Sequence, residues 1–383
     1  MNEIGVLKEM VSGERRVALV PDHVPDLVKA GLGVVIEEGA GEGAGYSDQE
    51  YRDKEAEVRP REEVLSRVNV LLTVRTAAAV PTEEWRTYSG LNDGAVIIGF
   101  ANPYEKHPAF EELAEKKASL LAMELMPRIT RAQSMDALSS MANLGGYKAV
   151  LLAANHLPRI FPMMMTAAGT IMPTQVFILG VGVAGLQAIA TAKRLGAVVS
   201  AYDVRSEVKE QVQSLGAKFL EVELEESELQ TEGGYAKEMD EEFYRRQREM
   251  MHKVVAESDV IITTAAVPGK KAPTLVTTDM VKQMKPGSVI VDIAAERGGN
   301  CELTKTGETV REHGVTIIGP TDIPSRLAFN SSRLYSKNIT SFLLHLLQEG
   351  KPVLDREDEI TGKTLVLENG KPTSDEIRSR LGL

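Results

Sequence analysis

The sequence predicts an α/β protein with two domains, each built on a doubly wound parallel sheet. Three observations lead to that fold class. Short apolar runs alternate with helical patterns, as in parallel sheets covered by helices. A glycine-rich turn joins one such run, 176–179, to a helical pattern. The length of 383 residues suits two domains at about 100 to 200 residues each. Both domains are therefore expected to be Rossmann-like.

The composition is typical of a soluble globular protein. Hydrophobic residues make up 43% of the chain, charged residues make up 26%, and the formal net charge is -11. The acidic balance and the lack of a basic cluster argue against nucleic acid or anionic lipid as a direct partner. The single cysteine, Cys301, cannot form an intrachain disulfide, which favours a reducing compartment. Prolines and glycines interrupt the most apolar region, 160–189, so no direct membrane insertion is expected.

Residues 1–125 are expected to form most of the first sheet. A first helix is expected at 21–30, where apolar residues recur at helical spacing and Gly31 is a stop signal. Another helix is expected to end within 111–117. The expected strands are 4–7, 33–37, 70–74, 95–99 and 120–124.

A polar segment, 124–146, interrupts this alternation. It follows the last of those strands, and ligands bind at the carboxyl ends of strands in open α/β sheets. From spacing alone, a ligand-binding loop and a solvated loop with an N-capping Ser or Asp are equally good interpretations. A helical stretch, 141–152, leads on from it. The polar side chains of the segment are Arg128, Arg131, Gln133, Ser134, Asp136, Ser139 and Ser140.

The glycine-rich turn has the spacing of a dinucleotide-binding fingerprint. Gly180 permits a tight turn, Gly182 lets a pyrophosphate approach the backbone, and Gly185 lets the helix pack closely on the strand. The helix N-terminus offers unpaired N–H groups to the phosphates. Asp203 ends the next strand, where a carboxylate accepts ribose hydroxyls, so NAD is favoured over NADP. Arg205 is the exception to this pattern, because an arginine there could meet a 2′-phosphate.

The second domain continues with further strands at 198–202, 218–222, 260–264, 288–293 and 315–318. Between them, 221–249 is predicted to be a long acidic excursion that ends as an exposed charged helix. An amphipathic helix is expected within 330–350, and the final thirty residues could return to the first domain. The expected domains are 1–145 with 330–383, a discontinuous α/β domain, and 146–329, the NAD(H)-binding Rossmann domain.

Two other residue types bear on function. The six histidines lack metal-ligand spacing, so no metal site is expected. The run at 163–165 consists of three methionines, and core packing at a domain junction is the favoured interpretation over a partner groove.

Several strings of residues are shared with a known family. They are MELMPRITRAQSMDALSS, GYKAV, FPMMMTAAGT, GVGVAGLQAIATAKRLGA, GGYAKEM, ITTAAVPGK and MKPGSVIVDIA. The chain resembles the NAD(H)-binding component, domain I, of proton-translocating nicotinamide nucleotide transhydrogenase over most of 1–345. The resemblance implies NAD(H) in an interdomain cleft, and a translocase and oxidoreductase that is active only with its partners. It also implies a homodimer and direct hydride transfer to NADP(H) on a partner domain III. A separate membrane domain would move protons.

The same resemblance implies a location and a set of site residues. The chain would be the split form of the subunit, cytoplasmic and peripheral to the inner (plasma) membrane through its partners. Nicotinamide contacts are implied for Arg128, Gln133, Asp136 and Ser139. Further cofactor contacts are implied for Ile129, Thr130, Ser134, Met135, Gly180, Gly182, Val183, Gly185, Asp203, Val204, Arg205, Gly234, Tyr235, Gln247 and Ala266.

The alternatives are a stand-alone NAD-dependent amino-acid dehydrogenase and an NAD-binding module without catalysis. Alanine dehydrogenases share the opening pattern KEMVSGERRVALVP, and Arg16 matches their substrate arginine. Their catalytic lysine falls on Arg75, their catalytic histidine falls near Asn102, and their active-site aspartate falls on Glu296. An arginine stays protonated and an asparagine cannot titrate, so alanine deamination lacks its acid–base group.

Overall fold

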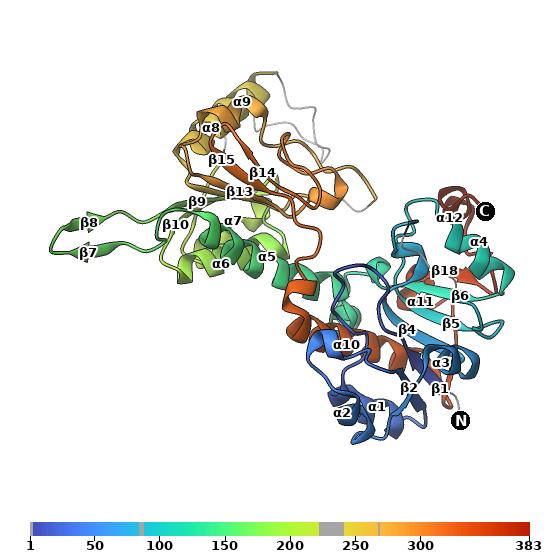
Figure 1. The fold of residues 1–383 in the computed structure, drawn as a ribbon. Coiled ribbons are helices and arrows are strands. Elements are labelled where there is room, and N and C mark those ends of the chain that lie inside the picture. The colour runs from blue at the N-terminus through green and yellow to red at the C-terminus, as the bar shows by residue number, and fades with distance from the viewer. Residues whose placement is uncertain (1–2, 84–87, 222–240, 267–268) are drawn as a thin grey trace. The chain divides into compact units, whose positions relative to one another are not determined.

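The computed structural model describes residues 3–83, 88–221, 241–266 and 269–383, with the backbone alone at 241–244. Two compact units account for the chain (Figure 1). Unit 1 consists of Met1–Met141 and Pro324–Leu383, and unit 2 consists of Ala142–Ile323. Each unit is a sheet with helices packed on it, so the predicted α/β class is confirmed.

Unit 1 contains an eight-stranded sheet in which six neighbouring strands are parallel. Its order is β3 (Glu57–Arg59), β2 (Gly33–Glu37), β1 (Glu3–Val6), β4 (Val70–Arg75), β5 (Val96–Phe100), β6 (Ser119–Ala122), β18 (Leu365–Glu368) and β19 (Lys371–Pro372). The parallel part has the doubly wound 3-2-1-4-5-6 order. β18 pairs antiparallel with β6, and β19 pairs antiparallel with β18. The last predicted strand ends early, because residues 123–125 form a 3-10 turn.

The helices of unit 1 include one long helix, α10 (Ala328–Leu346). Its predicted apolar face is confirmed, since Ile339, Phe342 and Leu343 are fully buried. The first predicted helix is a 3-10 turn, Pro21–His23, followed by α1 (Val24–Lys29). The remaining helices are α2 (Asp48–Arg52), α3 (Arg61–Arg67), α4 (Pro108–Glu115), α11 (Glu359–Thr364) and α12 (Asp375–Leu381).

Unit 2 contains a seven-stranded sheet with the same central order. The strands run β11 (Lys218–Phe219), β10 (Val198–Tyr202), β9 (Gln175–Leu179), β12 (Val260–Thr263), β13 (Val289–Asp292), β15 (Val315–Ile318) and β14 (Thr309–Glu312). All neighbouring pairs are parallel except β14 with β15. The helices are α6 (Val183–Arg194), α7 (Lys209–Ser214), α8 (Glu241–Glu257) and α9 (Thr278–Gln283), with most of α5 (Ala137–His156).

In unit 2, the helices α5 and α6 cross so closely that their backbones are in contact. A Cβ atom on Gly146 of α5 would lie 2.0 Å from the carbonyl oxygen of Ala184 in α6. Beneath this crossing, Val176 and Ile178 of β9 pack with Ile189 of α6. The start of α6 is therefore fixed by its contacts with the strand and with a second helix.

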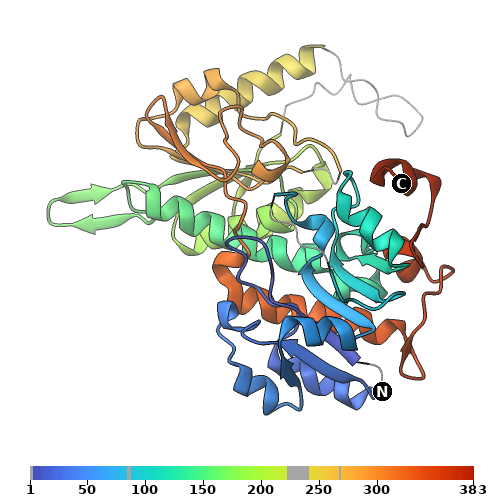
Figure 2. The same cartoon turned by 45° about the vertical axis from the view of Figure 1, so that its right-hand side comes forward.

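A β-hairpin stands away from the sheet of unit 2, as both views show (Figures 1 and 2). It consists of β7 (Met164–Thr166) and β8 (Gly169–Ile171), which pair antiparallel. The prediction that the methionine run packs in a core is wrong. Met163 is 57% exposed and Met165 is 74% exposed, and Met172 beyond the hairpin is 73% exposed. Apolar composition cannot separate a core segment from an exposed strand pair whose backbone bonds are made within the pair.

Candidate functional site

The turn after β9 leaves no room for side chains at two of its three glycines. Gly180 has a φ of +90°, and its N–H donates to the carbonyl of Tyr202 at 2.9 Å. A Cβ atom on Gly185 would lie 2.0 Å from the Gly180 carbonyl oxygen. By contrast, a Cβ atom on Gly182 would have no atom within 4 Å. Gly180 and Gly185 thus serve the fold, whereas the space at Gly182 is open to a ligand.

The N-terminus of α6 faces this open space without a side-chain cap. Gly182 is the N-cap residue, and no side-chain hydrogen bond satisfies the first turn among the described residues. Val183 at the first helical position is 38% exposed. Free N–H groups and the positive end of the helix dipole form a binding site for an anion such as a pyrophosphate.

Asp203 connects the end of β10 to this turn. Its carboxylate accepts hydrogen bonds from the N–H groups of Val181 at 2.7 Å and Arg205 at 2.9 Å, and from Arg205 Nε and Nη2, both at 3.0 Å. Burial alone would raise the pKa of Asp203, but the bonds from Arg205 and Val181 outweigh it and hold the pKa below its ordinary value. Asp203 therefore stays ionised at neutral pH.

The four donors fill the roughly four acceptor positions that a carboxylate offers. A ribose diol can bind to Asp203 only if the Arg205 guanidinium moves away. The Arg205 side chain is 53% exposed, so it can move into solvent at little cost. Val204, between the two, is 81% exposed and presents an apolar surface beside them.

Replacing Asp203 with asparagine is expected to weaken NADH binding by about tenfold and to reduce the preference for NADH over NADPH. The amide oxygen still accepts from Val181, so the turn keeps its shape, whereas the charge that repels a 2′-phosphate is lost. Dissociation constants for both nucleotides, measured by calorimetry, test this. An unchanged ratio of the two constants would show that Asp203 does not set the preference.

The loop after β12 packs against the glycine-rich turn and is hydrogen-bonded to it. The residues that make these contacts lie outside the dinucleotide-binding fingerprint. Thr264 Oγ1 donates to the Gly180 carbonyl at 2.9 Å. The fully buried Asn300 accepts from the N–H of Ala265 and donates to its carbonyl, at 3.0 and 2.8 Å. These bonds fix the loop that carries the exposed Ala266, one of the expected cofactor contacts. A polar residue directly after an apolar strand could have indicated Thr264, but nothing local indicates Asn300.

The three remaining expected contacts of unit 2 have different outcomes. Gln247 of α8 donates from Nε2 to the hydroxyl of Tyr202, directly before Asp203. It therefore lies next to the fingerprint, on the charged helix expected at the end of the acidic excursion. Gly234 and Tyr235 lie outside the described residues.

The polar segment of unit 1 forms a six-residue 3-10 helix, Thr130–Met135, before α5. Met135 is buried and Ile129 is half-buried, so these two anchor the segment. The side chains of Arg128, Thr130, Gln133 and Ser134 belong to exposed residues and are accessible to a ligand.

Asp136 caps the N-terminus of α5. Its Oδ1 accepts from the N–H of Ser139 at 2.9 Å and its Oδ2 accepts from Ser139 Oγ at 2.5 Å. The capping role, one of the two interpretations of the segment, is therefore present. The cap also fixes the Asp136 carboxylate, since both of its oxygens are held.

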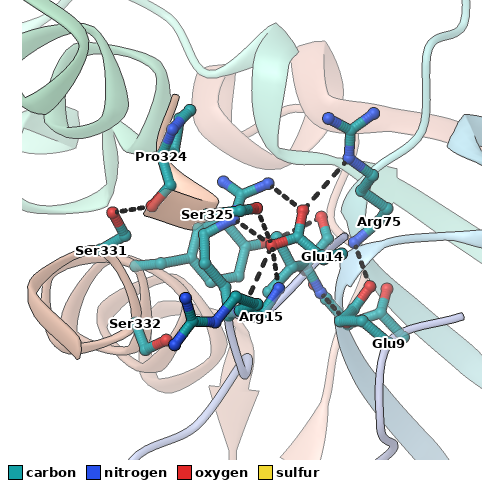
Figure 3. Close-up of polar contacts among 12 residues, drawn as sticks. Glu9, Glu14, Arg15, Arg75, Pro324, Ser325, Ser331 and Ser332 are labelled. Atoms are coloured by element: carbon teal, nitrogen blue, oxygen red, sulfur yellow. Dashed lines mark hydrogen bonds and ion pairs between the residues drawn. The ribbon is translucent and has the colours of Figure 1, made fainter. Parts of the chain in front are cut away.

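Buried charged residues gather at the carboxyl ends of β1 and β4 in unit 1 (Figure 3). The carboxylate of Glu14 accepts hydrogen bonds from Arg16 Nε at 2.8 Å, Arg16 Nη2 at 2.5 Å and Ser325 Oγ at 2.5 Å. It also forms an ion pair with Arg75 Nε at 3.4 Å. Burial opposes ionisation of Glu14, but these donors, Arg16 first, lower its pKa to about 2. Nearby, Glu9 accepts from the N–H groups of Val74 and Arg75 at 2.6 and 3.0 Å.

Glu9 is expected to make unit 1 less stable as the pH rises. Burial of its carboxyl, helped by repulsion from Glu14, raises the pKa of Glu9 from 4.5 to about 7. Between these values the folded state holds a proton that the unfolded state has lost, so stability falls by at most about 3 kcal/mol from pH 4.5 to 7. Glu9→Gln should flatten this dependence in urea unfolding curves at pH 5 to 8. An unchanged slope would contradict the assignment to Glu9.

The residues at the positions that match dehydrogenase groups are divided between the two units. Arg16 is buried in its ion pair with Glu14, and Arg75 contacts the same carboxylate. Asn102 donates its N–H to Glu124 at 2.6 Å from a left-handed conformation, with φ of 48°. Glu296 is exposed on a 3-10 turn of unit 2.

The described residues contain neither a metal-binding cluster nor a membrane-spanning helix. No group of three His, Cys, Asp or Glu side chains is placed to hold a metal ion in the described part of the chain. Within the same ranges, none of the helices has the length and apolar character needed to cross a lipid bilayer.

Known proteins match both units. The family described as Alanine dehydrogenase/PNT, N-terminal domain, matches residues 5–145, and its C-terminal domain counterpart matches 149–375. The chain is 48% identical over 374 residues to an NAD(P) transhydrogenase subunit alpha chain of Rhodospirillum rubrum, covering 96% of this chain and 97% of the relative. The crystal structure of transhydrogenase from Sinorhizobium meliloti superposes with a TM-score of 0.87 at 43% identity, covering 97% of this chain and all of the other.

A more distant match is a structure of L-alanine dehydrogenase. It superposes with a TM-score of 0.80 at 25% identity, and 99% of each chain is covered.

Proposed function

The chain belongs to the alanine dehydrogenase/PNT family, and from that premise we propose that it is the NAD(H)-binding subunit of an NAD(P) transhydrogenase. The single observation that carries the proposal is the open, uncapped start of α6 at Gly182, next to an ionised Asp203. A dinucleotide fits these residues, because the phosphates meet free N–H groups and the ribose meets a carboxylate. The finer roles below are proposals from the same premise.

Unit 2 would hold the adenosine and pyrophosphate. The N–H groups at the start of α6 bind the phosphates, and Asp203 binds the adenosine ribose once Arg205 has moved away. Ala266 and Val204 offer apolar surface, and Gln247 holds Tyr202 beside the ribose site. Gly234 and Tyr235 are proposed to contact the nucleotide as well.

Unit 1 would hold the nicotinamide end. The bound nucleotide supplies the hydride, and the protein supplies position and exclusion of water. Gln133 and Arg128 are exposed donors for the carboxamide and ribose, and Asp136 with Ser139 fixes the end of the segment. Ile129, Thr130, Ser134 and Met135 would line the same segment. No side chain has to exchange a proton with the reacting carbon, in agreement with the lack of an acid–base group at Arg75 and Asn102.

The chain would act with partners. NADP(H) would be held by a partner domain, a membrane subunit would couple the exchange to proton translocation, and the chain would lie peripheral to the membrane through them. A homodimer is part of the proposal. The hairpin Met164–Ile171 supports it, because large exposed apolar side chains on a projecting strand pair indicate a protein contact.

Mixing the chain with the NADP(H)-binding domain of a transhydrogenase, NADPH and an oxidised NAD analogue tests the function. Reduction of the analogue should depend on both proteins. No exchange at any ratio would overturn the proposal, and steady NAD reduction by alanine with this chain alone would establish the amino-acid dehydrogenase instead.

Changing the hairpin tests the dimer. Met165→Asp places a charge at a 74% exposed apolar position, so it should leave the free energy of unfolding nearly unchanged and convert the dimer to a monomer. Light scattering measures the mass, with Lys363→Gln on a surface ion pair as the control. A variant that stays dimeric would remove the hairpin from the interface.

A further inference from the structure

Two side chains from the C-terminal part of unit 1 hold the 3-10 helix Thr130–Met135 from outside. Asn338 Nδ2 donates to the carbonyl of Ser134 at 2.8 Å. Asp358 Oδ1 accepts from Arg131 Nη2 at 3.0 Å. The partners lie 204 and 227 residues apart along the chain. The bond from Asn338 holds the backbone directly after Gln133, and the bond to Asp358 holds the side chain of Arg131, two residues before Gln133.

Asn338 is an unfavourable residue for packing alone. It lies on α10 with only 6% of its surface exposed. Its Oδ1 has no hydrogen-bond partner among the described residues. Burying an unsatisfied amide oxygen costs free energy, and the bond to Ser134 offsets only part of that cost. A leucine of similar size would avoid the cost, so the asparagine is explained by what it does to the segment.

Asp358 is itself firmly held. Its Oδ2 accepts from the N–H groups of Ile360 and Thr361 at 3.1 and 3.0 Å, and from His345 Nε2 at 2.9 Å. Burial opposes ionisation of Asp358, but the donors, beginning with the Thr361 N–H, keep its pKa well below the ordinary value. Asp358 is the N-cap of α11 and is also bonded to the last turn of α10, so its carboxylate is held in place. It can therefore restrict the motion of the exposed Arg131 side chain.

We infer that Asn338 and Asp358 are positioning residues for the 3-10 helix Thr130–Met135, the segment proposed to bind the nicotinamide. They hold Ser134 and Arg131 and thereby set the placement of Gln133. The inference rests on the proposed function, since it assumes that this segment presents the nicotinamide. Hydride transfer needs the reacting carbons about 3 to 3.5 Å apart, and a misplacement of about 1 Å costs about 100-fold in rate. An exposed segment needs such external bonds to keep that placement.

Asn338→Leu separates positioning from stability. The unfolding temperature should change little, because removal of the buried unsatisfied oxygen offsets the loss of the bond to the Ser134 carbonyl. The rate of hydride exchange at saturating NADH should fall about tenfold, while the NADH dissociation constant changes less than threefold. An exchange rate equal to that of the unmodified chain would overturn the role of Asn338.

Asp358→Asn tests the second bond. Asparagine is as good an N-cap as aspartate, so α11 is kept while the charge that holds Arg131 is lost. Asp358→Asn, Arg131→Gln and the double variant should each slow exchange to a similar extent, about fivefold, because all three remove one interaction. Arg131→Lys should retain part of the rate. Additive losses in the double variant would show that Asp358 does not act through Arg131.

A matched control and a distinct failure complete the test. Arg356→Gln removes an exposed ion pair with Glu368 in the same C-terminal segment and should leave exchange unchanged. If the unmodified chain gives no exchange with the NADP(H)-binding domain, the proposed function fails. If it does exchange and the variants at 338 and 358 lose only NADH affinity, the positioning inference alone fails.

Discussion

Replacing Gly182 with alanine is expected to weaken NADH binding by about 30-fold while the free energy of unfolding changes by no more than about 1 kcal/mol. The residue has φ of -86° and ψ of -164°, which alanine adopts without strain. A Cβ atom there meets no protein atom within 4 Å, so the folded state accepts it. The methyl group would instead occupy the approach of the pyrophosphate to the start of α6. Calorimetric titration and urea unfolding give the two quantities.

Gly185→Ala is the matched control for that experiment, because it adds the same methyl group three residues later. Its Cβ atom would lie 2.0 Å from the Gly180 carbonyl oxygen, a backbone atom that cannot move aside. We expect a loss of about 3 kcal/mol or more in the free energy of unfolding of unit 2. Equal effects of the two substitutions on stability would show that Gly182 is a structural glycine, and the anion site would then be in doubt.

Asp136→Asn is expected to slow hydride exchange by about tenfold to 100-fold, with the NADH dissociation constant changed less than threefold. Asparagine keeps the cap of α5, since its oxygen accepts from the Ser139 N–H and its amide donates to Ser139 Oγ. The helix and the segment before it therefore stay in place, and only the charge is removed. Exchange measured at saturating nucleotide, beside equilibrium titration, separates the two parameters.

Asp279→Asn on α9 controls for the change in net charge, because it removes the same charge from an exposed position. Its exchange rate should equal that of the unmodified chain. Should Asp136→Asn also leave the rate intact, the aspartate would be a helix cap and nothing more. If Asp136→Asn weakened NADH binding by the same factor as it slowed exchange, Asp136 would contribute to binding and not to hydride transfer.

The sequence predicted the central strands of both sheets because strands buried on both faces are continuous apolar runs. β1, β4, β9 and β12 all follow that rule. Two of the strands it missed are at sheet edges, and a third, β18, is a buried run of four residues between β6 and β19. β14 has the sequence TVRE with only half-buried and exposed positions, and β3 has three residues, so neither forms an apolar run. The exposed hairpin was missed for the opposite reason, since its residues are as apolar as a core.

The candidate site was predictable where the chemistry is local. The fingerprint and Asp203 follow one another along the chain, and their spacing alone indicates the turn. Thr264 bonds to that turn from 84 residues away, and Asn300 holds the neighbouring loop through Ala265, 35 residues away. Asn338 and Asp358 act over still longer separations. Such contacts depend on which strands and helices become neighbours, and a pattern read over a short window cannot contain that information.

The return of the C-terminal segment to unit 1 determines the order in which the chain can fold on the ribosome. Unit 2 is complete once residue 323 has been synthesised, whereas unit 1 still lacks α10 and the strand β18 that pairs with β6. The inserted unit can therefore reach its native state first, although nascent chains usually fold from the N-terminus onward. Until the last sixty or so residues emerge, β6 is paired only with β5, and its other edge remains open to the cell's chaperones.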